Sequence, residues 1–190
     1  MRKKRNIPPK HVTYIFVEGE TEAAYFNELK QKYNAGSTQI IKKLNGSGDY
    51  VDQAEKQVTA SNNVPDNKVL IFDTNGKTSP QIKKLLTKAQ SKGYDFGYSN
   101  TCFELWLLAH FEQVSQSLIN EKNLIIKLNN YVTTGKYKKA DPNQIARIVE
   151  TAEGAINNSK SISSINISTL NLGFQFTTVG EIVEKHFTNK

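Results

Sequence analysis

The first hundred residues alternate between short apolar runs and longer amphipathic segments. Residues 12–17 (VTYIFV) and 68–73 (KVLIFD) are apolar at consecutive positions, which is typical of parallel strands covered on both sides. Weaker strands are predicted in residues 37–44 and 94–100, and helical patterns separate the strands. Right-handed crossovers between such strands give an α/β fold, in which an open parallel sheet carries helices on both faces.

Polar residues at the ends of the helical patterns predict where several helices begin and end. Asp49 and Ser79 are the expected N-caps of the second and third helices. Gly93 is expected to end the third helix. Near the C-terminus, Thr178 and Glu181 have the spacing of a capping box.

Beyond residue 100 the pattern becomes helical. Residues 103–111 (FELWLLAHF) are apolar nearly all round, which predicts a buried helix. Asp141 and Pro142 are expected to open a single helix whose apolar stripe extends to Ile156. The chain is therefore expected to consist of a basic tail, an α/β core and a helical extension packed on that core, at residues 1–11, 12–100 and 101–190 respectively.

The amino-acid composition indicates which kinds of molecule the protein could bind. The chain has 25 Lys and Arg against 18 Asp and Glu, a formal net charge of +7, which favours polyanions such as nucleic acid. Lysines that only solubilise helix faces would give the same excess. No stretch approaches the roughly 20 apolar residues of a membrane span, and the basic start leads into no signal region. The single cysteine, Cys102, excludes an internal disulfide and fits a cytoplasmic protein.

Two carboxylates follow strands of the predicted sheet. Glu18 ends the first strand and Asp73 ends the third, so both are expected at the carboxyl edge, where open α/β sheets bind ligands. Neighbouring carboxylates repel each other unless a cation or a shared proton relieves the repulsion. Mg²⁺ or Mn²⁺, which prefer oxygen ligands, would suit this position. Alternatively, the two acids simply cap helix N-termini, where negative charge is favourable.

Three segments, in order along the chain, carry a resemblance to a known family. Residues 16–26 (FVEGETEAAYF), 71–75 (IFDTN) and 99–111 (SNTCFELWLLAHF) resemble the RloB family, which includes the AbiLii-type abortive-infection proteins. The similarity extends from about Val12 to Phe111 and more loosely to the C-terminus. That family in turn resembles the Toprim proteins, the catalytic fold of topoisomerases, primases and OLD-type nucleases.

The resemblance implies that residues 12–100 form a Toprim-like α/β core with a site of the Toprim kind. Glu18 matches the glutamate that follows the first strand, and Asp73 matches the first aspartate of the Asp-x-Asp pair after the third strand. The second aspartate is replaced by Asn75, which keeps a carbonyl oxygen for a metal but removes one negative charge. This departure favours a one-metal site over a two-metal site.

Two further positions match the RloB pattern in the helical half. Glu104 and His110 are six residues apart, which on one helix turns their side chains about 120° away from each other. We therefore expect Glu104, at the helix start, to be the third acid of the site unless it only binds a buried partner. His110 is better explained as a histidine with satisfied hydrogen bonds in the core, although it stays a candidate site residue, as does Glu22.

The resemblance implies a metal-dependent nuclease in anti-phage defence that cuts DNA or RNA, tRNA included, together with a partner ATPase of the AAA or ABC kind. Self-association into a homo-oligomer is also open. The expected contacts to nucleic acid come from four lysines: Lys77, Lys136, Lys138 and Lys139. One alternative is a non-catalytic nucleic-acid-binding or regulatory subunit with a degenerate site, which Asn75 would explain. Another is an enzyme that acts on a small phosphorylated molecule.

Overall fold

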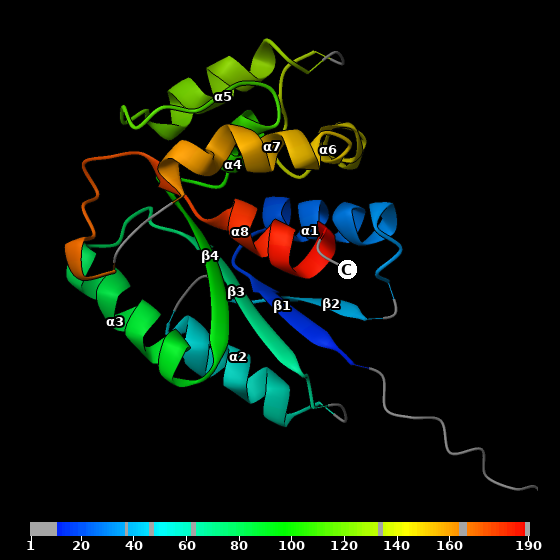
Figure 1. The fold of residues 1–190 in the computed structure, drawn as a ribbon, viewed down its shortest axis with the longest axis vertical. Helices are drawn as coiled ribbons and strands as arrows, with labels where there is room; N and C mark the ends of the chain where they lie inside the picture. The colour runs from blue at the N-terminus through cyan, green and yellow to red at the C-terminus, as the bar shows by residue number, and fades with distance from the viewer. Residues whose placement is uncertain are drawn as a thin grey trace, which may run out of the picture.

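The computed structural model describes residues 11–36, 38–45, 48–61, 64–132, 135–163 and 167–188, so the predicted basic tail lies outside it apart from His11. None of the helices in these ranges is long and apolar enough to cross a membrane. The elements (Figure 1) are, in order, β1 (Thr13–Val17), α1 (Glu20–Lys32), β2 (Gln39–Lys43), α2 (Tyr50–Thr59), β3 (Asn67–Asp73), α3 (Ser79–Ser91), β4 (Tyr94–Asn100), α4 (Glu104–Ala109), α5 (Glu121–Asn129), α6 (Pro142–Val149), α7 (Ala152–Ser159), the 3₁₀ turns η1 (Lys160–Ile162) and η2 (Ile167–Thr169), β5 (Phe176–Thr177), α8 (Val179–Val183) and a π-helical turn η3 (Glu184–Thr188).

The strands form one five-stranded sheet in the order β2-β1-β3-β4-β5. The first four strands are parallel, and β5 pairs with β4 in the antiparallel sense. In this order the chain moves from β1 to one side first and then returns to the other, so β1 and β3 flank the switch point where such sheets bind ligands. The predicted α/β class, a mostly parallel sheet with helices on both faces and a helical C-terminal part, is confirmed.

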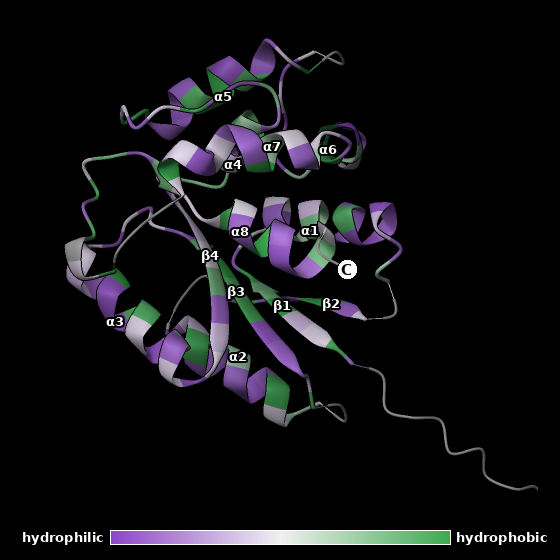
Figure 2. Cartoon of the chain, viewed as in Figure 1, coloured by the Kyte–Doolittle hydropathy of each residue, from purple (hydrophilic) through white to green (hydrophobic). Residues whose placement is uncertain are grey.

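Alternate side chains of the central strands enter two separate cores. In β1, Ile15 and Val17 join one core, whereas Tyr14 and Phe16 join the other. The first core is shared with α1 and the C-terminal helices, and the second with α2 and α3, on opposite sides of the sheet in Figure 1. The covering helices α2 and α3 alternate between hydrophobic and hydrophilic residues (Figure 2), as helices with one buried face must.

The structure confirms one predicted helix start and corrects another. The side chain of Asp49 accepts hydrogen bonds from the backbone nitrogens of Val51 and Asp52 and caps α2, as predicted. The predicted cap Ser79, however, is already the first residue of α3, and Thr78 is the N-cap. The backbone N–H of Thr78 donates to Oε1 of Gln81 at 2.8 Å, a bond of the capping-box type. The helix is therefore capped one residue earlier than predicted.

The single helix predicted from Pro142 to Ile156 is wrong, because the structure divides it into α6 and α7. At the break, the hydroxyl of Thr151 donates to the carbonyl of Ile148 at 3.1 Å. The ammonium of Lys32 donates to the carbonyl of Val149 at 3.0 Å. The backbone N–H of Thr151 also donates to the Ile148 carbonyl, at 3.2 Å. The side-chain bonds add to such backbone bonds, so the helix can end there with these carbonyl groups paired.

The predicted capping box of Thr178 and Glu181 is also wrong. Thr178 is the N-cap of α8 but makes no side-chain cap bond. Its hydroxyl oxygen instead accepts the backbone N–H of Tyr98, in β4, at 3.0 Å. The two residues before it form β5, a strand too short for any periodic pattern to reveal. The hydroxyl therefore joins the last helix to the sheet.

Candidate active site

Glu18 directly follows β1, and its carboxylate reaches the end of β3. Its Oε2 lies 3.4 Å from the backbone nitrogen of Asp73, whose N–H donates to it. Its Oε1 accepts a hydrogen bond from the hydroxyl of Tyr50 and lies 3.6 Å from Nζ of Lys77. The two acids predicted from the strand ends are thus neighbours at the switch point of the sheet.

Asp73 is the last residue of β3 and carries a perturbed carboxyl group. Burial, and next the negative charge of Glu18, raise the pKa of Asp73 to about 6. Two contacts hold this turn in place: Oδ1 of Asp73 accepts the backbone N–H of Asn75 at 3.0 Å, and Nζ of Lys77 donates to the carbonyl oxygen of Asp73 at 3.2 Å. A carboxyl group whose pKa is raised in this way gains from a nearby cation.

Glu22 lies in the first turn of α1 and is only 6% exposed. Burial raises its pKa to about 7, and the negative charges of Asp73, Glu104 and Glu18 add to the shift. The side chain therefore exchanges a proton near neutral pH. It belongs to the same acidic group as the two residues at the strand ends.

Gly19 makes room for this buried carboxylate. A Cβ atom at position 19 would lie 2.5 Å from Oε2 of Glu22, closer than real contacts allow. Its φ of −123° is an ordinary value, so alanine there would strain contacts but not the backbone. The glycine between Glu18, which follows β1, and Glu20, which begins α1, is thus explained by the space that Glu22 needs.

We expect Gly19→Ala to displace the Glu22 carboxylate from its buried position, because the added Cβ and Oε2 of Glu22 cannot occupy the same space. The pKa of Glu22 should then fall towards that of an ordinary glutamate, and titration of the folded protein measures the shift. Gly36→Ala is the matched control, because a Cβ at position 36 meets nothing within 4 Å. Equal effects of the two substitutions would contradict the packing argument.

Glu104 is the first residue of α4 and is 2% exposed. The hydroxyl of Tyr137 donates to its Oε1 at 3.3 Å, and Nζ of Lys139 lies 3.3 Å from the same oxygen. Lys139 also pairs with Glu121 at 2.6 Å. The helical half therefore brings one acid, together with its own cation, to the acids of the sheet.

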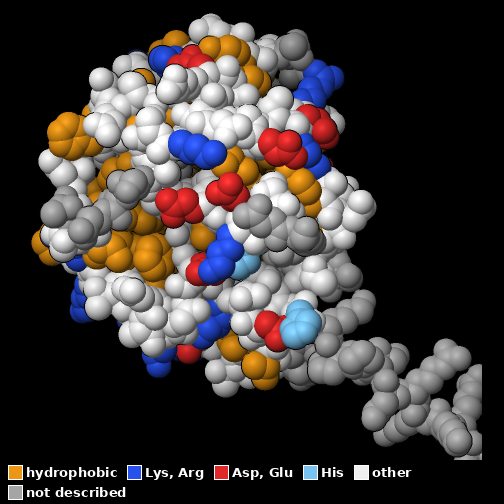
Figure 3. All heavy atoms as spheres, in the orientation of Figure 1, with side chains coloured by type: hydrophobic (Ala, Val, Ile, Leu, Met, Phe, Trp, Pro, Cys, Tyr) orange, Lys and Arg blue, Asp and Glu red, His pale blue; other side chains and the backbone are white. Residues whose placement is uncertain are grey.

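These residues share one cavity. Its volume is about 500 Å³, and its charged lining residues are Glu18, Glu20, Glu22, Asp73, Glu104 and Lys139. Among the described residues, no three of the His, Cys, Asp and Glu side chains form a ready-made metal site. On the face seen in Figure 3, acidic and basic side chains lie interspersed rather than in one continuous basic surface.

Two predicted candidates lie outside this cavity. His110 is buried against α1, where its Nε2 lies 3.1 Å from the hydroxyl of Tyr25 and its Nδ1 lies 3.2 Å from Oγ1 of Thr151. Burial lowers its pKa to about 3, so it is a neutral core residue, the interpretation favoured for it from the sequence. Asn75 is exposed and does not line the cavity, although its backbone N–H contacts Asp73.

The predicted lysines separate into two groups. Lys77 and Lys139 contact acids of the cavity. Lys136 and Lys138 are exposed, and their backbones are fixed by hydrogen bonds with the side chain of Gln144.

The sequence analysis missed two tyrosines whose hydroxyl groups donate hydrogen bonds to the acids of the site. The hydroxyl of Tyr50 donates to Glu18, and Tyr137 is buried and donates to Glu104. Tyr50 follows the predicted cap Asp49 directly, which places it at the start of a helix near the same edge of the sheet. The sequence held no comparable signal for Tyr137.

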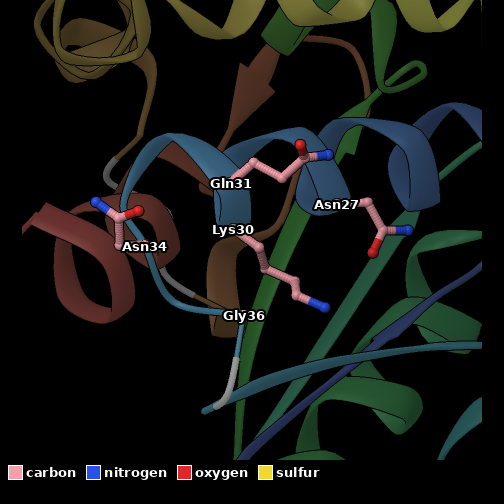
Figure 4. Close-up of a pocket in the computed structure, with 5 residues that line it drawn as sticks. All are labelled: Asn27, Lys30, Gln31, Asn34 and Gly36. Atoms are coloured by element: carbon pink, nitrogen blue, oxygen red, sulfur yellow. The ribbon is translucent and has the colours of Figure 1, made fainter.

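A larger cavity, of about 720 Å³, lies elsewhere, along α1. Figure 4 shows Asn27, Lys30 and Gln31 projecting from the helix, with Asn34 and Gly36 in the segment that follows. Its lining holds amides and one ammonium group but no carboxylate, imidazole or thiol. Acid–base or metal chemistry is therefore better supported in the acidic cavity.

Comparison with known proteins supports the resemblance seen in the sequence. Searches of curated proteins and of solved structures found no match. The family model described as RloB-like protein matches residues 13–185, which include every acid of the cavity and almost the whole chain. The chain therefore belongs to the RloB-like protein family.

Proposed function

We propose that the protein is a Mg²⁺-dependent nuclease of the Toprim kind, which cuts phosphodiester bonds of DNA or RNA in abortive-infection defence under the control of a partner ATPase. The observation that carries the proposal is the contact between Glu18 and Asp73 at the switch point of the sheet. Membership of the RloB-like family is consistent with it.

The acids fit a magnesium ion by their chemistry. Mg²⁺ keeps several waters and usually takes one or two protein carboxylates together with substrate phosphates, so it does not need three preformed ligands. Glu18 and Asp73 would hold it, since both offer oxygen atoms and the raised pKa of Asp73 marks a place where a cation is favourable. Mn²⁺, which accepts similar ligands, would be expected to replace it.

The other side chains of the site would each have a separate role in the reaction. When bound, the metal would polarise a phosphoryl oxygen and a water molecule. Lys77, in contact with Glu18 and with the Asp73 carbonyl, would neutralise the substrate phosphate. Glu22, with a pKa of about 7, could accept a proton at neutral pH. Tyr50 and Lys77 keep the Glu18 carboxylate oriented towards β3.

The purified full-length chain, mixed with labelled single-stranded DNA, duplex DNA and RNA, should cut at least one of them in Mg²⁺ or Mn²⁺ and none in EDTA. Mg²⁺ should also raise the melting temperature of the wild-type protein, because a ligand that binds only the folded state stabilises it. Absence of cutting and of the thermal shift, with and without a partner ATPase, would refute the proposal.

A second function is a nucleic-acid-binding or regulatory subunit without catalysis. The exposed Asn75, at the position of the second Toprim aspartate, favours it. Nucleic-acid binding without cutting under all metal conditions would support this function, whereas metal-dependent cutting would exclude it.

A further inference from the structure

A second cavity adjoins the acidic one on the α2 and α3 side of the sheet. Its volume is about 230 Å³, and its polar lining comes from Asp49, Tyr50, Lys77, Gln81 and Lys84. Typical small-molecule sites measure about 300–1,000 Å³, so this cavity suits a single small group better than a whole nucleotide.

The cavity lining holds two ammonium groups, those of Lys77 and Lys84, against one carboxylate, that of Asp49. Oδ2 of Asp49 lies 2.9 Å from Nζ of Lys88, which also pairs with Asp52 at 2.7 Å. Oδ1 of Asp49 accepts the backbone N–H groups that start α2. Lys84 is exposed, and within the described part of the chain no hydrogen bond or ion pair engages its ammonium group. An ammonium group without a partner, facing a small polar cavity, is suited to bind an anion.

Two residues connect this cavity with the acidic one. Tyr50 and Lys77 line it, and each also contacts Oε1 of Glu18 in the acidic cavity. Nζ of Lys77 lies 5.0 Å from the centre of the Tyr50 ring, which fixes the pair at the boundary. An extended polyanion that crosses Lys77 would therefore meet both cavities in succession.

We propose that this second cavity, the basic cavity, binds a phosphodiester of the substrate strand that neighbours the phosphodiester being cut. The inference rests on the proposed nuclease function and adds the side from which the strand is held. Successive phosphates of one DNA strand are about 3.4 Å apart along the axis, so phosphates one or a few nucleotides away come within reach of the basic cavity. Lys84 supplies the charge and Lys77 connects the two positions.

Binding rather than cutting tests this inference. The full-length Asp73→Asn protein, in which the amide oxygen can still accept the N–H of Asn75, is titrated with a labelled oligonucleotide at several salt concentrations. Adding Lys84→Ala should weaken binding several-fold and reduce the slope of log K against log salt by about 0.7–0.9, the value for one lost phosphate contact. Lys92→Ala is the control, because this exposed lysine, the C-cap residue of the same helix, does not line the basic cavity.

The outcomes separate the two proposals. If Asp73→Asn binds the oligonucleotide and Lys84→Ala changes neither affinity nor slope, the basic cavity is refuted while the nuclease proposal stands. If the chain binds no nucleic acid, both are refuted. A third outcome is that inorganic phosphate or a mononucleotide displaces the oligonucleotide at equal phosphate concentration, and that Lys84→Ala abolishes this displacement. The cavity would then be a site for free phosphate, which would overturn its assignment to a substrate strand.

Discussion

Asp73→Asn is expected to lower the rate of metal-dependent cutting at least about a hundredfold while the folded protein becomes more stable. The activity falls because the amide supplies no negative charge for the cation. The stability rises because the folded state no longer confines a carboxylate beside Glu18, where its pKa is raised to about 6. With allowance for partial exposure, the gain at pH 8 is about 2 kcal/mol. Cleavage of a labelled oligonucleotide and thermal unfolding of the same preparation measure the two effects.

Asp95→Asn provides a control of opposite sign. Asp95 accepts hydrogen bonds from Lys185, at 2.8 Å, and lies 2.8 Å from Nε2 of His186. It stands near the start of β4, whereas Asp73 pairs with Ser99 near the end of that strand. Replacement of Asp95 should cost stability and leave the cutting rate unchanged. Full activity of Asp73→Asn, or a stability loss equal to that of Asp95→Asn, would contradict the role assigned to Asp73.

Glu22→Gln is expected to raise the free energy of unfolding by about 2–3 kcal/mol at pH 8, which corresponds to roughly 5–10 °C in melting temperature for a chain of this size. The reason is that burial raises the pKa of Glu22 from 4.5 in the unfolded chain to about 7 in the folded one. The folded state therefore binds the proton more tightly, and the wild-type carboxylate destabilises it once ionised. The penalty is absent below pH 4.5, grows as the pH rises, and is complete above about pH 7.

The measurement is the difference in stability between wild type and Glu22→Gln across this range. His110, whose pKa is lowered to about 3, makes both proteins lose stability as the pH falls below 6.5, and this contribution cancels in the difference. Glu20→Gln is the matched control, because Glu20 stands in the same first turn of α1 but is exposed and paired with Lys43. A difference that stays constant between pH 5 and pH 8 would disprove the assignment.

The four parallel strands could be predicted from the sequence because they are long enough to show a pattern, whereas the two-residue β5 is not. The apolar runs that end in Glu18 and Asp73 gave both the strand positions and the edge where the acids meet. The predicted helix boundaries were wrong where a contact with a residue far away in the sequence determines the local structure. The break between α6 and α7 depends on Lys32, and the start of α8 depends on the backbone of Tyr98.

The candidate site could be predicted only in part for the same reason. Glu18 and Asp73 follow from the topology, and Glu104 was expected from the family pattern. Tyr50 and Tyr137 donate hydrogen bonds to Glu18 and Glu104. The hydrophobic periodicity of the segments that contain these tyrosines does not indicate a site. A side chain's burial depends on the whole tertiary structure, so the raised pKa of a residue such as Glu22 has no local signature.

The short strand β5 and the helix after it also constrain when the protein can fold. Phe176 and Thr177 complete the outer side of β4, and a Cβ at Gly97 of that strand would lie 2.9 Å from Ile182, so α8 sits directly on the sheet. On the ribosome, residues up to 100 emerge long before the segment that covers them. The part of the sheet that α8 covers must therefore wait, exposed to water or to a chaperone, until residues 176–183 have been made.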